Sequence, residues 1–391
     1  MGCSDEGNPA GSQLKANRLA ILCLVVLGII LTLGLWPFHS PRNQVTWLGS
    51  RDGLRFRNYG TAISSSSLRS LAWPYQGEVS IEIWLRPRLS NGSGTILTFY
   101  TPQTGAQFSL SQSLTDLEFR TQRGHATTAK LYVEGVFRKT ASLFITVTSG
   151  VRGTSIYFDD TLVKRLPGFH IPGDLSGRMV LGDSAGQSHT WEGQIFGAAV
   201  YGRELPTAAV LRHYRTWGCQ RRPQITEDDN NVARYLFDEH AGNVVHNRAD
   251  TGANLFIPDR YVVLDQIFLE PMWKEFEMSW SYWGNAAKNI IGFIPLGFWF
   301  YAYLSGVPGV RRVGLFTIVL GSLVSLTIEV VQAYLPTRDS GTTDLITNTL
   351  GTWIGIISYR ALTPTVRRFF SGLICFGYLS DTTVPKERRV P

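Results

Sequence analysis

Pairs of polar side chains recur at helical spacing within the apolar C-terminal third of the sequence. The pairs are Asn285 with Asn289, Glu329 with Gln332, and Asp344 with Asn348. Residues three or four positions apart lie on one face of a helix, so each pair presents its polar groups together. Amides and carboxylates placed in this way can hydrogen-bond a polar ligand, or they can cap and lock the helices that carry them.

Glu329 is the most informative of these residues because it lies inside the apolar run Val313–Tyr334. A carboxylate at membrane depth is costly unless it is paired or neutralised. Arg338 follows in the next loop, and its planar fork could hold this carboxylate with two hydrogen bonds. Helix capping is an equal alternative for Asp344 and Asn285. The ligand site predicted from these residues consists of Glu329, Arg338, Gln332, Asn289, Asp344 and Asn348.

Four apolar stretches are candidates to carry these groups through a membrane. The first has no charged residue and is long enough to span. It ends in Trp-Pro-Phe rather than at a small-residue cleavage site, so we interpret it as a retained anchor, with a cleaved signal segment as the alternative. The four stretches are Leu19–Trp36, Ile290–Leu304, Val313–Tyr334 and Leu345–Leu362.

Basic residues mark one side of these stretches. Lys15 and Arg18 precede the first stretch, Arg311 and Arg312 separate the second from the third, and a basic tail follows the fourth. Because basic loops stay in the cytoplasm, both termini should be cytoplasmic and the long segment after the first stretch should be extracytoplasmic. The three polar pairs then share one depth near the outer face. The net charge of +7 is explained by topology and requires no nucleic-acid partner.

The long middle segment changes to short alternating strands broken by Gly, Asn, Asp and Ser. With 44% hydrophobic residues and four cysteines in 391 residues, the chain is neither disordered nor a disulfide scaffold. Evenly spaced strands predict an antiparallel β-sandwich. Glu82 alternates with apolar neighbours and is expected to be exposed, whereas Trp84 and Trp191 are expected in the core. The clearest runs are Val79–Leu85, Gly94–Phe99, Leu143–Val147 and Ser155–Phe158, with a short helix at Thr207–Trp217.

Three motifs of this segment carry a family resemblance. They are EVSIEIWLRP at Glu78–Pro87, VLGDS at Val180–Ser184 and WEGQIFGAAVYGRELP at Trp191–Pro206. In this order they resemble the laminin-G-like, concanavalin A-like jelly roll. The run at Ala233–Pro258 is similar to the strand that opens such domains but comes last here, which suggests a circular permutation.

The jelly-roll resemblance implies binding of glycans or proteins, sometimes with calcium. Asp159, Asp160 and Asp183 are candidate ligands, but they form no calcium-loop pattern, and the favoured alternative is that they are ordinary turn residues. No pair of carboxylates suited to glycoside hydrolysis is recognisable. We therefore predict no catalytic residue, no metal site and no cofactor.

The C-terminal motifs resemble the VanZ-like membrane proteins. They are NIIGFIPLGF from Asn289, EVVQAYLPTR from Glu329 and DLITNTLG from Asp344. The resemblance implies a bacterial inner-membrane protein with four spans. The founding member of the family is linked to teicoplanin resistance, but the large outer insertion departs from the minimal family pattern, so we do not carry that role over. Gly292 and Gly297 are expected to allow close helix approach.

The predicted architecture is an all-β jelly-roll sandwich inserted in a four-helix transmembrane bundle. Its segments, in order, are a cytoplasmic tail (1–17), a first transmembrane helix (18–37), an extracytoplasmic jelly roll (45–260), an aromatic interfacial linker (261–285), a three-helix VanZ-like region (286–362) and a cytoplasmic tail (363–391).

Two functions fit this architecture. In the first, the membrane core binds a lipid-linked or cell-wall-related ligand at its outer-leaflet polar layer, and the jelly roll binds a glycan or an envelope protein. In the alternative, the protein is a membrane-anchored lectin or adhesion module whose helices serve only as an anchor. An intramembrane enzyme is less favoured because no nucleophile or metal set is visible, and four spans without an inverted repeat disfavour a transporter. Membrane lipids are expected partners in either case.

Overall fold

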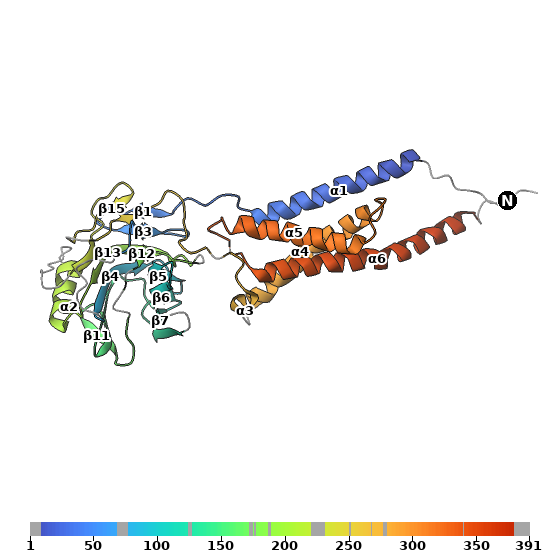
Figure 1. Ribbon diagram of the computed structural model, residues 1–391. Coiled ribbons are helices and arrows are strands. Elements are labelled where there is room, and N and C mark those ends of the chain that lie inside the picture. Colours follow the sequence, from blue (N-terminus) through green and yellow to red (C-terminus); the bar gives the residue numbers. More distant parts are fainter. Residues whose placement is uncertain are drawn as a thin grey trace, which may run out of the picture. The chain divides into compact units, whose positions relative to one another are not determined.

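The computed structural model describes residues 9–68, 77–123, 127–171, 175, 177–186, 189–219, 231–249, 252–266, 268–276, 280–338 and 340–378. The chain forms two compact units, one of residues His39–Gln266 and one of Met1–Phe38 with Ile267–Pro391 (Figure 1). The first is built mainly of strands and the second of helices. The outermost parts of both predicted tails, 1–8 and 379–391, lie outside the described residues.

One sheet of the β unit has eight strands in the described part of the chain. Its order is β1-β2-β13-β4-β9-β10-β11, and β14 pairs with β13. The bounds are β1 (Val45–Trp47), β2 (Leu54–Phe56), β13 (Gly193–Tyr201), β4 (Val79–Pro87), β9 (Leu143–Gly150), β10 (Gly153–Phe158), β11 (Thr161–Leu166) and β14 (Asn231–Tyr235).

The other sheet has the order β15-β16-β3-β12-β5-β6-β7-β8, and its pairings are antiparallel. The late segment therefore supplies strands to both sheets, since β14 joins β13 and β16 joins β3. This agrees with the predicted antiparallel sandwich of jelly-roll type. The bounds are β15 (Val244–Val245), β16 (Leu255–Phe256), β3 (Ala62–Ser64), β12 (Arg178–Leu181), β5 (Ser93–Thr101), β6 (Gly105–Ser113), β7 (Asp116–Arg123) and β8 (Thr127–Val133).

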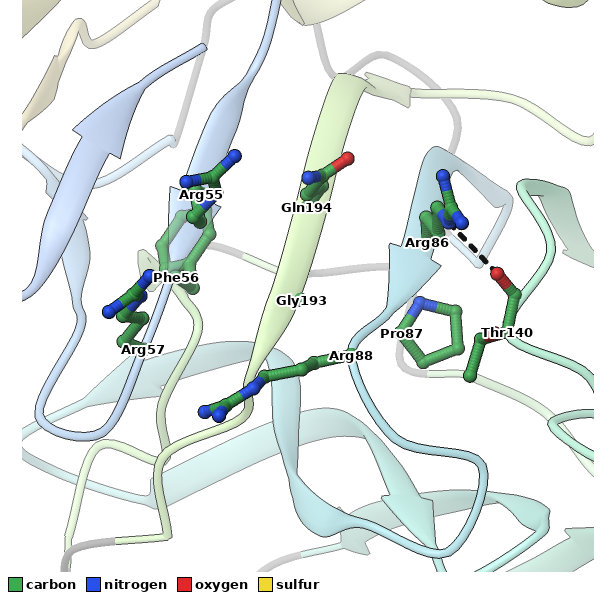
Figure 2. Close-up of a pocket in the computed structure, with 9 residues that line it drawn as sticks. All are labelled: Arg55, Phe56, Arg57, Arg86, Pro87, Arg88, Thr140, Gly193 and Gln194. Carbon is green, nitrogen blue, oxygen red and sulfur yellow. Dashed lines mark hydrogen bonds between the residues drawn. The ribbon is translucent and has the colours of Figure 1, made fainter.

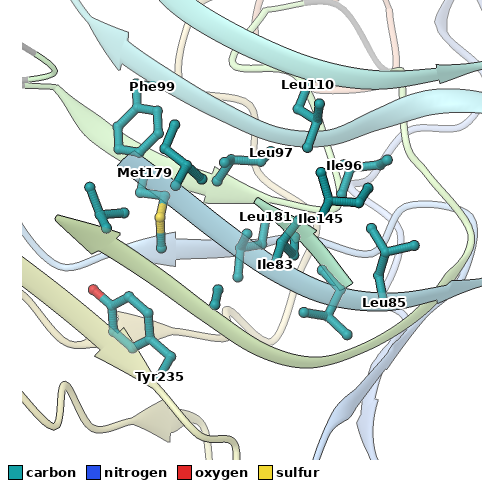
Figure 3. Close-up of a cluster of buried hydrophobic side chains, with 14 of the residues drawn as sticks. Ile83, Leu85, Ile96, Leu97, Phe99, Leu110, Ile145, Met179, Leu181 and Tyr235 are labelled. Carbon is teal, nitrogen blue, oxygen red and sulfur yellow. The ribbon is translucent and has the colours of Figure 1, made fainter. Parts of the chain in front are cut away.

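Alternating apolar residues of the two sheets form one continuous core (Figure 3). Ile83 of β4 pairs in register with Ile145 of β9, and Leu97 of β5 pairs with Leu181 of β12. All four side chains are almost fully buried. Each such side chain stabilises the fold by roughly 1.5–3 kcal/mol relative to exposure. Trp191 is also in this core, as its alternation with apolar residues predicted.

The prediction that Glu82 is exposed is wrong. The face of β4 that carries it is covered by α2 (Thr207–His213), and Glu82 has no exposed surface. The hydroxyl of Tyr201 donates to its carboxylate at 2.7 Å, and Nδ1 of His213 lies 3.0 Å from the same group. Strand alternation cannot reveal such a cover, because the covering helix lies more than a hundred residues further along the chain.

Helices α4 and α6 of the helical unit approach closely through glycines. A Cβ atom at Gly297 would overlap the carbonyl oxygen of Thr352, and one at Gly355 would overlap that of Ile294. Gly292 differs from the prediction, because nothing lies within 4 Å of the position of its Cβ. The helices are α1 (Pro9–Leu35), α3 (Met272–Glu275), α4 (Trp280–Leu304), α5 (Val313–Gln332) and α6 (Thr342–Tyr378).

Two helical segments among the described residues are long and apolar enough to cross a membrane, Ala16–Leu35 and Val313–Gln332. These coincide with the first and third predicted spans. Helices α4 and α6 do not meet the same criterion of length and composition. Polar residues within them, among them Asn289 of α4 and Asp344 near the start of α6, lower their apolar character. The other two spans therefore stay predictions.

Candidate functional site

A cavity of about 450 Å³ lies within the helical unit and has two chemically different walls. One wall is apolar and comes from α1 and α4, with Val26, Ile29, Ile30, Leu33, Phe293 and Pro295. The other wall is polar and comes from α4, α5 and α6. It contains five of the six residues predicted for the site, namely Asn289, Glu329, Gln332, Asp344 and Asn348.

The two carboxylates of the polar wall lie at helix ends, whereas Asn289 lies inside α4. Glu329 and Gln332 lie on the last turn of α5, and Asp344 lies in the first turn of α6. A carboxylate at a helix N-terminus is favourable because it faces the positive end of the helix dipole. Nδ2 of Asn289 donates to Oδ1 of Asp344 at 2.7 Å and so ties α4 to α6. Asp344 follows the helix start by two residues and Asn285 is well inside α4, so neither occupies the N-cap position.

Glu329 is almost completely buried, with 1% of its surface exposed. Its Oε2 accepts a hydrogen bond of 2.9 Å from the backbone N–H of Gly341, the residue that precedes α6. The first N–H groups of a helix have no partner within the helix, so a carboxylate from a neighbouring helix can satisfy one of them. Glu329 thus has a structural task in addition to lining the cavity.

Arg338 does not direct its fork at Glu329 as we predicted. Its Nε donates to the carbonyl oxygen of Trp36 at 3.2 Å, and its Nη2 donates to the same oxygen. Helix α1 ends at Leu35, where the last carbonyl groups lack partners and a cation is favourable. Arg338 therefore caps α1 and is not among the residues that line the cavity.

Two buried amide oxygens in the cavity have no hydrogen-bond partner among the described residues. Gln332 uses Nε2 to donate to the carbonyl oxygen of Gly34 at 2.7 Å, which leaves its Oε1 unpaired. Asn348 donates from Nδ2 to Oγ of Ser325 at 2.9 Å and leaves its Oδ1 unpaired. Gln332 is 7% exposed and Asn348 is 5% exposed. A buried acceptor without a partner costs about 1–3 kcal/mol, so both oxygens are available to a donor that enters the cavity.

Lys288 is the cation among the residues that line this cavity. Its side chain is exposed, and Nζ donates to Oδ1 of Asn285 at 3.3 Å. The polar wall therefore combines two carboxylates, three amides and one ammonium group. Within the described part of the chain, no group of three or more His, Cys, Asp or Glu side chains is arranged to hold a metal ion.

Sequence reasoning did not identify the apolar wall. The residues of α1 that form it belong to a uniformly apolar run, in which no pattern distinguishes the cavity side from the opposite side. Ser325 and Gly34, which accept hydrogen bonds from the two amides, were also missed. Ser325 is a single hydroxyl in an apolar run, and Gly34 contributes only its backbone carbonyl.

The β unit has a polar groove of about 430 Å³ on the outer face of β5, β6 and β7. The strand register aligns Thr98, Ser109 and Arg120 in one row and Thr95, Ser111 and Glu118 in the next. Nη2 of Arg120 donates to Oε2 of Glu118 at 3.2 Å. The groove therefore presents hydroxyls together with an ion pair.

The aspartates considered for calcium are engaged by the protein. Asp183 is buried, and its carboxylate accepts hydrogen bonds from the N–H groups of Ser184 at 2.8 Å and His189 at 3.1 Å, and from the hydroxyl of Tyr261. Burial raises the pKa of Asp183 to about 7, against the opposing effect of these donors. Asp159 accepts from the N–H of Phe144 at 3.0 Å and occupies a turn. These contacts fit the turn alternative.

Comparison with known proteins agrees with both resemblances. The family model for VanZ/LLP1 matches residues 236–363, and the model for the concanavalin A-like lectin/glucanase superfamily matches residues 58–211. The chain thus combines a VanZ-like region with a concanavalin A-like domain. No curated protein matches significantly.

Solved structures similar to this chain include a pentraxin and the binding domain of a neurotoxin. A heptameric SAP-like pentraxin from Limulus polyphemus is 15% identical over 56% of this chain and 93% of its own, with a TM-score of 0.34. The binding domain of botulinum neurotoxin DC, solved with rat synaptotagmin II, is 14% identical over 45% of each chain, also with a TM-score of 0.34. Both are distant likenesses.

Proposed function

We propose that the helical core binds an amphiphilic ligand, either a lipid-linked or a cell-wall-related molecule. The observation that carries this proposal is the pair of unpaired amide oxygens, on Gln332 and Asn348, in a cavity whose opposite wall is apolar. A ligand with hydroxyl or amide N–H donors at one end and a hydrocarbon chain at the other matches both walls.

The polar end of such a ligand can form hydrogen bonds with the side chains of the polar wall. Each hydrogen bond to a buried acceptor recovers part of the desolvation cost of that acceptor. Glu329 and Asp344 add two carboxylates, and Lys288 at the exposed end suits a ligand that also carries a negative group.

The hydrocarbon end of the ligand fits the wall made by α1 and α4. Val26, Ile30 and Leu33 lie on consecutive turns of α1 and, together with Ile29, form an apolar strip along the cavity. An acyl or polyprenyl chain would lie along this strip and continue into the surrounding lipid.

We further propose a location for this site. In a four-span topology with cytoplasmic termini, the helix ends that carry the polar wall lie near the outer leaflet of the bacterial inner membrane. The jelly roll is then extracytoplasmic, where it can meet a glycan or an envelope protein. The basic loop at Arg311 and Arg312 supports this orientation.

The membrane-anchored lectin is the second candidate function. The hydroxyl-rich groove on β5, β6 and β7 favours it, because rows of Thr, Ser and charged side chains offer the donors and acceptors that sugar hydroxyls need. Tyr132 of β8 pairs in register with Glu118 of β7. It is 43% exposed, so its ring is accessible for stacking on a sugar.

Native mass spectrometry of the purified protein tests the proposal. Wild type should carry a co-purified amphiphile, and Gln332→Leu should retain about tenfold less, since one lost hydrogen bond is worth about 1.4 kcal/mol. Ser322→Ala on the same helix is the matched control, because Ser322 bonds Thr349 and does not line the cavity. Equal retention by all three proteins, each folded and monodisperse, would contradict the proposal and favour the anchored lectin.

A further inference from the structure

A second cavity, of about 340 Å³, lies in the β unit and is lined by four arginines (Figure 2). Arg55 and Arg57 belong to β2 and the residue directly after it, and Arg86 and Arg88 belong to the end of β4 and the residue after it. All four side chains are exposed. This groove is separate from the cavity of the helical unit and from the hydroxyl-rich groove.

The strand register explains why these arginines face the same side. Arg55 pairs with Gln194 of β13, and Gln194 pairs with Arg86 of β4, so the three side chains form one row across the sheet. In the adjacent row, Phe56 and Pro87 are buried, and Phe56 belongs to the hydrophobic core. Strands lie about 4.8 Å apart, which places the backbones of Arg55 and Arg86 about 10 Å from each other. Arg57 and Arg88 follow about 7 Å further along the strands.

Contacts with uncharged groups orient Arg86 and the neighbouring Gln194 and Arg51 without neutralising the two guanidinium charges. Nε of Arg86 donates to the carbonyl oxygen of Thr140 at 2.9 Å. Oε1 of Gln194 accepts from Arg51 at 2.9 Å, and the guanidinium of Arg51 stacks on Phe196. An uncharged carbonyl or amide orients an arginine but leaves its charge in place.

Little negative charge balances the groove. Glu192 forms an ion pair with Arg88. Among the described residues, no carboxylate forms an ion pair with Arg55, Arg57 or Arg86. Like charges held this close repel one another, and an oxoanion bound between them removes that repulsion. Arginine also matches carboxylate and phosphate oxygens with two parallel hydrogen bonds.

We propose that this groove binds a linear polymer that carries repeated oxoanions, either phosphodiesters or carboxylates. Two rows of arginine, spaced along the strands, can engage successive anionic groups of one chain. The hollow shape favours a chain over a flat membrane surface, and the apolar lining residues Phe56 and Pro87 are buried, so the groove offers no anchor for acyl chains.

The test uses full-length protein in phosphatidylcholine nanodiscs, with binding measured by calorimetry to a glycerol-phosphate hexamer and to a galacturonate hexamer. We expect at least one hexamer to bind, with about tenfold lower affinity in Arg55→Gln/Arg86→Gln. The matched control is Arg152→Gln/Arg165→Gln, which removes two exposed arginines elsewhere on the same unit and should change the affinity less than about twofold. Which hexamer binds distinguishes the phosphodiester from the carboxylate source.

A conservative variant separates geometry from charge. Arg55→Lys/Arg86→Lys keeps the charge but loses the fork, so it should bind the hexamer more weakly than wild type and more tightly than the Gln variant. The proposal is overturned if neither hexamer binds, or if the control variant weakens binding as much as the groove variant. Binding only to inorganic phosphate, or only to phosphatidylglycerol vesicles, would overturn it as well, since it would indicate a single-anion site or a membrane contact.

Discussion

At the scale of single residues, Glu329 combines two tasks, because its carboxylate lines the cavity and accepts from the N–H of Gly341. Glu329→Gln keeps an acceptor oxygen and should change the stability by less than about 1 kcal/mol. Glu329→Ala leaves that N–H unpaired and should destabilise the helical unit by about 1–3 kcal/mol. Thermal unfolding in detergent compares the two variants. Equal losses in both would show that the charge, and not the hydrogen bond, holds α6 in place.

Asp183 gives the β unit a pH dependence with a defined sign. Its pKa is about 7 in the folded chain and near 3.8 when unfolded, so the folded state binds this proton more tightly. The stabilisation is fully present below about pH 4 and is lost as the pH rises to about 7. The denaturant midpoint of the Asp183→Asn variant should not show this fall between about pH 4 and about pH 7. A wild-type midpoint that rises over this range relative to the variant would contradict the assignment.

Residue types and their spacing in the sequence predicted most of the cavity's polar wall. Glu329 and Asn348 are conspicuous because a polar group is costly in an apolar run. The partner of Arg338 was not predictable, because it is a backbone carbonyl group at the end of α1. Every residue has such a group, so the residue types do not indicate which one an arginine contacts. Glu82 shows the same limit, since its cover comes from a distant helix.

At the scale of elements, the contact between α4 and α6 depends on glycine. A Cβ at Gly355 would overlap the carbonyl oxygen of Ile294 and lie 2.7 Å from the backbone nitrogen of Phe298. Gly355→Ala should therefore force the helices apart and destabilise the unit by about 1–3 kcal/mol. Gly284→Ala on α4 is the matched control, because its Cβ meets nothing within 4 Å and Ala favours helix. Equal melting temperatures for the two variants would argue against this close approach.

Strands were predicted more fully than helices. Alternating apolar residues mark β4, β5, β9 and β10, because one face of each strand enters the core. The short β15 and β16 carry too few residues to show a period, and their place in the sheet follows from tertiary contacts alone. Gly292 and Gly297 of α4 both lie among apolar residues, so the sequence does not distinguish them. In the structure, Gly292 lines the cavity and Gly297 packs against α6.

At the scale of the whole molecule, the chain joins a VanZ-like region to a concanavalin A-like domain, and each unit has its own candidate ligand surface. The central claim is that the helical cavity holds an amphiphile in the intact protein. This claim predicts that blocking the cavity, without disturbing the helices around it, removes the ligand.

Gly292→Leu provides that measurement. Gly292 lines the cavity and its Cβ meets no atom within 4 Å, so a leucine there can fill the space while the helix packing is kept. Gly284→Leu makes the same change on the same helix outside the cavity lining. Native mass spectrometry should show the co-purified amphiphile on wild type and Gly284→Leu and about tenfold less on Gly292→Leu. Equal retention by the two leucine variants would contradict the claim that the ligand occupies this cavity.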